Sequence, residues 1–266
     1  MKRWFVMLFA CSLAAAVTQP AAAQQALKAA ASTPSDAAEA RAMLTRMTDY
    51  LAKAQRFSMT IDSAYDAVQA SGQKVEFGTV RQVLVSRPDK LRIDLVWRDG
   101  LKQTVRFDGK TITQYSPDEK VYASLPKTGT IDDAVHYIVE DLKTPIPLAV
   151  FLLTTVGQEM NGRTTEIALV DEETIGGRPT DHLAARTDDV DYQVWIAQGN
   201  EPVPLRVVIS YKKSPGQPQF SATFSDWNFN PEITPSAFVF EPPADVTQIA
   251  FMVPAPEPAR PVRARK

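Results

Sequence analysis

The chain has 266 residues, of which 44% are hydrophobic and 23% are charged, a globular composition that excludes disordered, collagen-like and polytopic membrane classes. Residues 1–23 hold two basic residues, and residues 254–266 hold four basic residues and one acidic residue, which leaves 23 basic and 30 acidic residues between them. This net charge of −7 in residues 24–253 is unfavourable for sequence-independent binding to DNA or RNA, so we expect no nucleic-acid partner.

The first 23 residues have the pattern of a secretory signal peptide. A positively charged start precedes an apolar run, and small residues at 21–23 follow it. We therefore expect the chain to be exported, with cleavage after Ala23. Two alternatives remain open. One is a single membrane-spanning anchor, although the run is shorter than the roughly 20 residues that an anchor needs. The other is a lipoprotein signal that ends at Cys11.

Residues 24–34 are rich in alanine and polar residues, and we expect them to form a flexible leader. A helix is predicted next, because Ser35 or Asp36 can cap it and its apolar residues recur at the spacing of a one-sided helix. These apolar positions are Met43, Leu44, Met47, Tyr50, Leu51 and Ala54. Such a stripe must pack on another element.

A period of two replaces the helical period from residue 57, which is typical of strands with one buried face. Turn residues at 98–100 and 108–109 have the composition of hairpin connections. We predict a meander of about six antiparallel strands up to residue 125. On the second of these strands, Arg81 shares one predicted face with Val83.

The alternation ends at Thr130, which can cap a second helix with Asp133 at its third position. This helix is predicted to end before the prolines at 145 and 147. The run at 148–153 is apolar at every position and much too short to span a bilayer. It must therefore be buried between elements or cover an apolar cavity.

Strands resume at about residue 164, and turn signals separate five of them up to residue 227. A last strand is predicted at 237–240, and the proline-rich residues 254–266 are predicted to be a disordered tail. The total is about eleven short strands with two helical insertions and no internal repeat. We expect a single domain over residues 35–253, in which a long antiparallel sheet curls and the helices fill its concave side.

Cys11 is the only cysteine, so the exported protein would have no disulfide, no thiol nucleophile and no cysteine-based metal site. His136 is predicted on a helix and His182 on a strand, neither with a second histidine or a carboxylate at ligand spacing. The chain also lacks the common hydrolase, metalloprotease, phosphate-loop and dinucleotide motifs. We therefore expect no metal, no cofactor and no catalytic residue, and hence a protein that is not an enzyme.

Several stretches carry a resemblance to a known family. Ser86-Arg87-Pro88-Asp89-Lys90-Leu91-Arg92 and the Phe-Asp-Gly-Lys hairpin at 107–117 resemble the outer-membrane lipoprotein carrier LolA. The Phe-x-Phe-x-Pro-Pro sequence at 238–243 is similar to the end of that family, and residues 144–148 are similar in placement to the apolar part of its lid.

More narrowly, the chain resembles a family of predicted periplasmic proteins of unknown function related to LolA. The motifs that carry this second resemblance include Asp181-His182-Leu183-Ala184 and Asp191-Tyr192-Gln193-Val194-Trp195-Ile196. The two resemblances together cover roughly residues 40–250.

The resemblance implies an α+β fold and a periplasmic location. The implied fold is a strongly curved antiparallel sheet, an unclosed half-barrel, with helices covering the concave side as a lid over acyl chains. Arg87 matches the LolA arginine before proline, whose side chain reaches the lid and helps to hold the cavity closed. The second half of the chain differs more from LolA, which leaves the ligand open.

An apolar ligand site needs a concave apolar wall with few polar groups. The same side chains could also form an ordinary core in which the helices fill the curve, and this alternative stays open. For Arg87 the alternative is a solvent-facing position at the end of a strand, and Arg81 and Arg92 are predicted to be surface charges. The predicted cavity wall and lid comprise Ile61, Phe77, Val83, Arg87, Ile93, Trp97, Phe107, Tyr115, Ile138, Leu148, Phe151 and Leu152.

Three functions compete. The leading hypothesis is a periplasmic carrier or chaperone that binds a lipid or an acylated protein, with a lid that moves around residues 131–155. The second is an envelope sensor or adaptor of the same fold that binds a partner protein. The third is a periplasmic hydrolase, which only unassigned carboxylates such as Asp191 motivate. The basic tail is a candidate for transient contact with anionic membrane surfaces.

Overall fold

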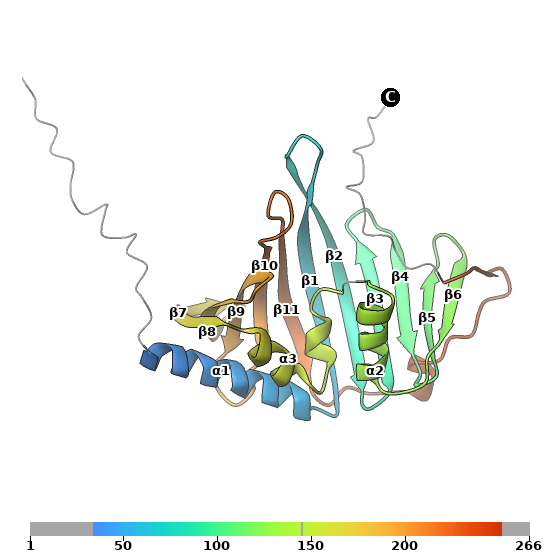
Figure 1. The fold of residues 1–266 in the computed structure, drawn as a ribbon. Coiled ribbons are helices and arrows are strands. Elements are labelled where there is room, and N and C mark those ends of the chain that lie inside the picture. Colours follow the sequence, from blue (N-terminus) through green and yellow to red (C-terminus); the bar gives the residue numbers. More distant parts are fainter. Residues whose placement is uncertain (1–33, 145, 252–266) are drawn as a thin grey trace, which may run out of the picture. The chain divides into compact units, whose positions relative to one another are not determined.

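The computed structural model describes residues 34–144 and 146–251 (Figure 1). The predicted signal peptide with its cleavage after Ala23, the leader up to residue 33 and the basic tail lie outside the described residues. Within the described residues, no helix has both the length and the apolar character needed to cross a membrane.

The described residues build one sheet of twelve strands in the order β12-β6-β5-β4-β3-β2-β1-β11-β10-β9-β8-β7 (Figure 1). All neighbours are antiparallel except β12, which pairs in parallel with β6. The first half of the chain joins the second through β1 and β11. The strands are β1 (Arg56–Val68), β2 (Lys74–Ser86), β3 (Lys90–Trp97), β4 (Lys102–Phe107), β5 (Thr111–Ser116), β6 (Val121–Pro126), β7 (Glu166–Ile175), β8 (Arg178–Arg186), β9 (Val190–Ala197), β10 (Pro204–Tyr211), β11 (Gln219–Asn228) and β12 (Thr247–Gln248).

The first helix, α1 (Pro34–Lys53), packs against β7, β9 and a later helix. Its apolar stripe packs on the core as predicted: Leu44, Met47 and Leu51 are fully buried, and Met43, Tyr50 and Ala54 are half-buried against it. The helix therefore covers the second half of the sheet and leaves the first half to other elements.

The other helices lie in one segment between β6 and β7, which we call the insert (residues 131–163). It contains α2 (Ile131–His136), a π-helical turn (Tyr137–Asp141), a 3-10 turn (Ala149–Leu152) and α3 (Val156–Arg163). The predicted cap of α2 is confirmed, because Thr130 and Asp133 form a reciprocal capping box. The apolar run at 148–153 is largely buried, as predicted. Helix α3 was not predicted, since Gly157 and Gly162 give it a low helix propensity.

The predicted strand at 237–240 is wrong. A 3-10 turn (Pro235–Ala237) occupies its start, and the last strand is instead the two-residue β12. The alternating phenylalanines are explained by ring packing: Phe238 is buried, and the Phe240 ring lies 5.1 Å from those of Tyr115 and Tyr122. The described chain thus has an α+β fold with a largely antiparallel sheet, as predicted.

Candidate ligand-binding site

Cross-strand register places three parallel rows of side chains on the face of the sheet that the insert covers. The first row is Phe57, Val85, Leu91, Phe107 and Ile112; the second is Met59, Val83, Ile93, Val105 and Gln114; the third is Ile61, Arg81, Leu95 and Gln103. Every side chain of the first row is buried, whereas most of the second and third rows are only half-buried. The face is therefore closed at the first row and more open toward the third.

A cavity of about 360 Å³ lies between these rows and the insert, and we call it the β1–β5 cavity. Its floor comes from all three rows, and Ile138, Leu148 and Leu152 of the insert lie over it. Its volume is within the usual range of small-molecule sites, and its walls are mainly aliphatic. It can therefore accept an apolar chain without a catalytic group.

A second cavity of about 290 Å³ lies on the other side of the insert, against β9 and β10. Ile146, Leu148 and Ala149 line both cavities, so a short stretch of the insert separates them. Leu148 has a φ of 68°, a left-handed backbone conformation that is costly for a branched side chain. Movement of this one stretch would change both cavities together.

Arg87 links the sheet to the insert. Its Nε donates to the carbonyl of Ala54 at 2.9 Å, and its Nη1 donates to the carbonyl of Leu152 at 2.8 Å. Its side chain is only 4% exposed, and its guanidinium carbon lies 5.9 Å from the centre of the Phe57 ring. Burial lowers the pKa of Arg87, and the nearby Asp132 raises it. The guanidinium thus joins the end of α1 to the 3-10 turn that covers the β1–β5 cavity.

Asp132 completes this connection. One of its carboxylate oxygens lies 3.8 Å from Arg87 Nη1, and the carboxylate accepts a hydrogen bond from the backbone N–H of Thr154 at 3.0 Å. The start of α2 and the residues after the 3-10 turn are therefore bound to the same charged pair. A few polar contacts hold the insert closed at this end.

The predicted wall residues lie in several different places. Those that line the β1–β5 cavity are Ile61, Val83, Ile93, Ile138, Leu148 and Leu152, and Phe151 lines the second cavity. Phe107 is part of the closed first row, while Phe77 and Trp97 share the covered face beyond the cavity. Tyr115 lies on the opposite face, since it pairs with Thr104 and its ring contacts Phe240. Arg87 contacts the cover and does not line a cavity.

The prediction that Arg81 is a surface charge is wrong. Arg81 lines the β1–β5 cavity, together with Gln103 and Gln114. The alternation along β2 contained this signal, because it put Arg81 on the same face as Val83. The surface position was expected because the side chain is positively charged, although the alternation indicated the covered face.

The family of the chain follows from its sequence as a whole. A family model described as predicted periplasmic protein (DUF2092) matches residues 40–252. The chain belongs to this family. The match confirms the narrower resemblance that the sequence motifs carried, and the family description agrees with the predicted location. The comparison with curated proteins finds no match.

Solved structures similar to this DUF2092 chain share little sequence with it. The lipoprotein LppX of Mycobacterium tuberculosis is 14% identical with a TM-score of 0.48, over 74% of this chain and 99% of LppX. LprF of Mycobacterium bovis is 13% identical with a TM-score of 0.47, over 79% and 98%. A LolA superfamily protein of Nitrosomonas europaea is 12% identical with a TM-score of 0.34, over 76% and 97%.

His182 lies in one of the DUF2092-like motifs, on the face of the sheet that carries Trp195. Its Nδ1 is 3.0 Å from a carboxylate oxygen of Asp171 and 3.4 Å from one of Glu173, and its Nε2 is 3.0 Å from Gln193 Oε1. Its ring also stacks on Trp195, with centroids 4.0 Å apart. The sequence shows no carboxylate at ligand spacing from His182, but pairing of β7 with β8 brings Asp171 and Glu173 to it from the neighbouring strand.

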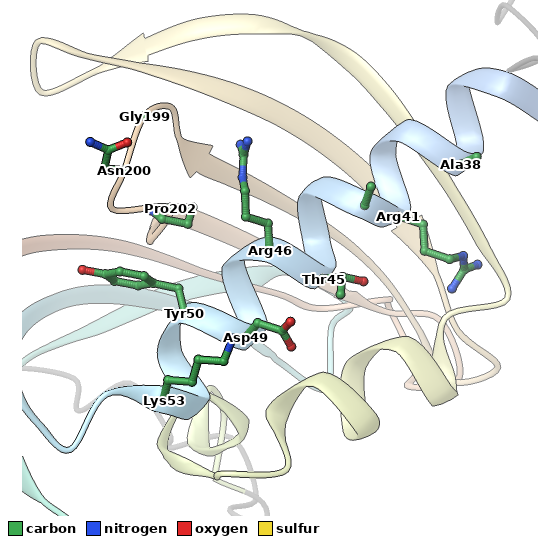
Figure 2. Close-up of a pocket in the computed structure, with 11 residues that line it drawn as sticks. Ala38, Arg41, Thr45, Arg46, Asp49, Tyr50, Lys53, Gly199, Asn200 and Pro202 are labelled. Carbon is green, nitrogen blue, oxygen red and sulfur yellow. The ribbon is translucent and has the colours of Figure 1, made fainter.

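An open groove of about 970 Å³ follows the outer side of α1 (Figure 2). Figure 2 shows Arg46 and Tyr50 on the side of the helix toward the loop 199–202. Arg46 lies 3.6 Å from Asp181, and Arg41 donates to the carbonyl of Thr164 at 3.3 Å. The charged lining suits a hydrated surface, so the β1–β5 cavity is the better candidate for an apolar ligand.

Proposed function

We propose that the protein is a periplasmic carrier or chaperone that holds an acyl chain of a lipid or acylated protein in the β1–β5 cavity, beneath the insert. The observation that carries the proposal is the cavity itself. It is mainly aliphatic and lies over a closed first row, under a cover held by few polar contacts. In this proposal the sheet curves around the insert as an unclosed half-barrel, and the signal peptide is cleaved after Ala23.

The hydrophobic effect is large enough to bind an acyl chain in the cavity without a covalent or catalytic step. Burial of about ten methylene groups contributes about 8 kcal/mol. Part of this free energy is offset by the lost motion of the ligand and by the ordering of the insert. A chain that reaches from the third row to the first would therefore bind reversibly, as a carrier requires.

Uptake requires the insert to move, and residues 131–155 are the proposed moving part. Arg87 and Asp132 hold this part through a carbonyl of the 3-10 turn and through Thr154. Release of these contacts would let the insert lift from the sheet, so that an acyl chain could enter the cavity beneath it. Once the insert closes again, its apolar run at 148–153 would lie against the acyl chain, so that the apolar surfaces of both are covered.

The test is lipid uptake by the variant Leu152→Glu. Leu152 is buried and lines the cavity, so a carboxylate at this position would need to be desolvated beside the acyl chain. We expect at least a tenfold loss of binding of a fluorescent fatty acid. Val96→Glu is the matched control, since Val96 is 41% exposed and lies outside the cavity. Unchanged uptake by the Leu152→Glu protein would contradict the proposal.

A further inference from the structure

We propose that Arg81 binds the anionic headgroup of the cargo, so that the β1–β5 cavity selects amphiphiles with a carboxylate or phosphate over neutral lipids. This inference rests on the proposed function and names the ligand class of the same site. It would make the third row the headgroup end of the cavity and the first row the acyl end.

The position of Arg81 is unusual for a cation. It lies in the third row between Ile61 and Leu95, and its side chain is half-buried in the lining of the cavity. Its Nη1 donates to the hydroxyl of Ser63, which is itself buried and 3.0 Å from the hydroxyl of Thr79. Burial lowers the pKa of Arg81, and the neighbouring Tyr65 raises it.

No carboxylate of the described residues lies within ion-pair distance of Arg81. Arg92 of the neighbouring strand β3 has such a partner, since it lies 2.7 Å from Asp94, whereas Arg106 of β4 has none among the described residues but does not line the cavity. A partly desolvated cation without a counter-charge is costly, and an incoming anion would remove that cost. The guanidinium has a fork of donors that fits two oxygens of a carboxylate or phosphate.

Two glutamines of the sheet also line the cavity. Gln103 is in the row of Arg81, and Gln114 is in the neighbouring row. Neither side-chain amide makes a hydrogen bond with another described residue. Gln103, in the same row, can therefore donate to the oxygens of an extended headgroup without breaking an existing contact.

The distances along the strands suit an amphiphile. Rows are two residues apart, so the third row lies about 13 Å from the first along a strand. The closed, fully apolar first row can take the end of an acyl chain while the headgroup stays at Arg81. A neutral headgroup at that position would leave the guanidinium without a counter-charge. Neutral lipids should therefore bind more weakly than anionic ones.

The experiment compares binding of palmitate, hexadecanol and monopalmitoyl glycerol phosphate to the exported protein after removal of bound lipid, by titration calorimetry. The three ligands share one chain length and differ in headgroup. We expect either anionic ligand to bind at least tenfold more tightly than hexadecanol. In the Arg81→Gln protein this preference should disappear through weaker binding of the anions, while Arg81→Lys should retain most of it.

Arg98→Gln is the matched control, because Arg98 is exposed and lies outside the cavity. Its headgroup preference should equal that of the wild type, and thermal melts should show that all variants are folded. Equal binding of palmitate and hexadecanol by the wild type, or an unchanged preference in the Arg81→Gln protein, would overturn the inference and leave the carrier function standing. Failure of all three ligands to bind would overturn the proposed function as well.

Discussion

At the scale of single residues, Arg87 directly after β2 and Arg81 on β2 have different roles. Arg87 donates to two backbone carbonyls through Nε and Nη1 and lies near a carboxylate, so its charge and these two donors are used within the protein. Arg81 has a hydroxyl partner but no carboxylate partner among the described residues, and it lines the cavity. The first side chain therefore serves the closed structure, and the second is available to a ligand.

Replacement of Arg87 by alanine should strongly destabilise the protein. It would leave the carbonyls of Ala54 and Leu152 without their donor and Asp132 without its cation. We expect the free energy of unfolding to fall by about 2–4 kcal/mol. Urea unfolding checks this value, with Arg98→Ala as the exposed control. A loss below about 0.5 kcal/mol would be typical of a surface position and would contradict the structural role.

At the scale of elements, local sequence signals predicted what depends on neighbours along the chain. The buried stripe of α1, the capping box of α2 and the hairpins of the first meander follow from spacing and turn residues alone. Helix α3 and β12 did not follow, because tertiary packing stabilises a glycine-containing helix and a two-residue strand with little local preference. The local pattern also did not predict that β7 pairs with β8 and so places the carboxylates of Asp171 and Glu173 beside His182.

The rows of the sheet should respond differently to truncation. Phe107 is 1% exposed in the closed first row, so Phe107→Ala should lower the free energy of unfolding by about 3–5 kcal/mol. Ile93 lies beside the cavity, where neighbouring space already limits its contacts, so Ile93→Ala should cost only about 1–2 kcal/mol.

The same two variants should differ in lipid uptake. Truncation of Ile93 changes the cavity wall, and we expect the Ile93→Ala protein to bind fatty acid more weakly. Chemical unfolding and fatty-acid titration of both proteins measure the two effects. Equal destabilisation by the two substitutions would indicate that the second row is ordinary core and that the cavity is filled.

At the scale of the whole molecule, the family and the α+β sheet were predictable from the sequence. Which half of the sheet forms the cavity and which half α1 covers were not. The first half of the chain supplies the floor of the β1–β5 cavity, and α1 covers part of the second half. The insert lies between two cavities and shares three residues with both. The resemblance implied that Arg87 reaches the lid, and the structure adds its contact with Leu152, but only the three-dimensional arrangement shows that Arg81 lines the cavity.

The central claim is that the exported protein carries an acyl ligand. Native mass spectrometry with lipid extraction tests it most directly, on protein exported to the periplasm and purified without detergent. We predict a stoichiometric adduct whose extracted ligand has an acyl chain and an anionic headgroup. Protein of bare mass, with no extractable lipid and no uptake of added fatty acid, would contradict the carrier function and favour a sensor or adaptor with a filled core.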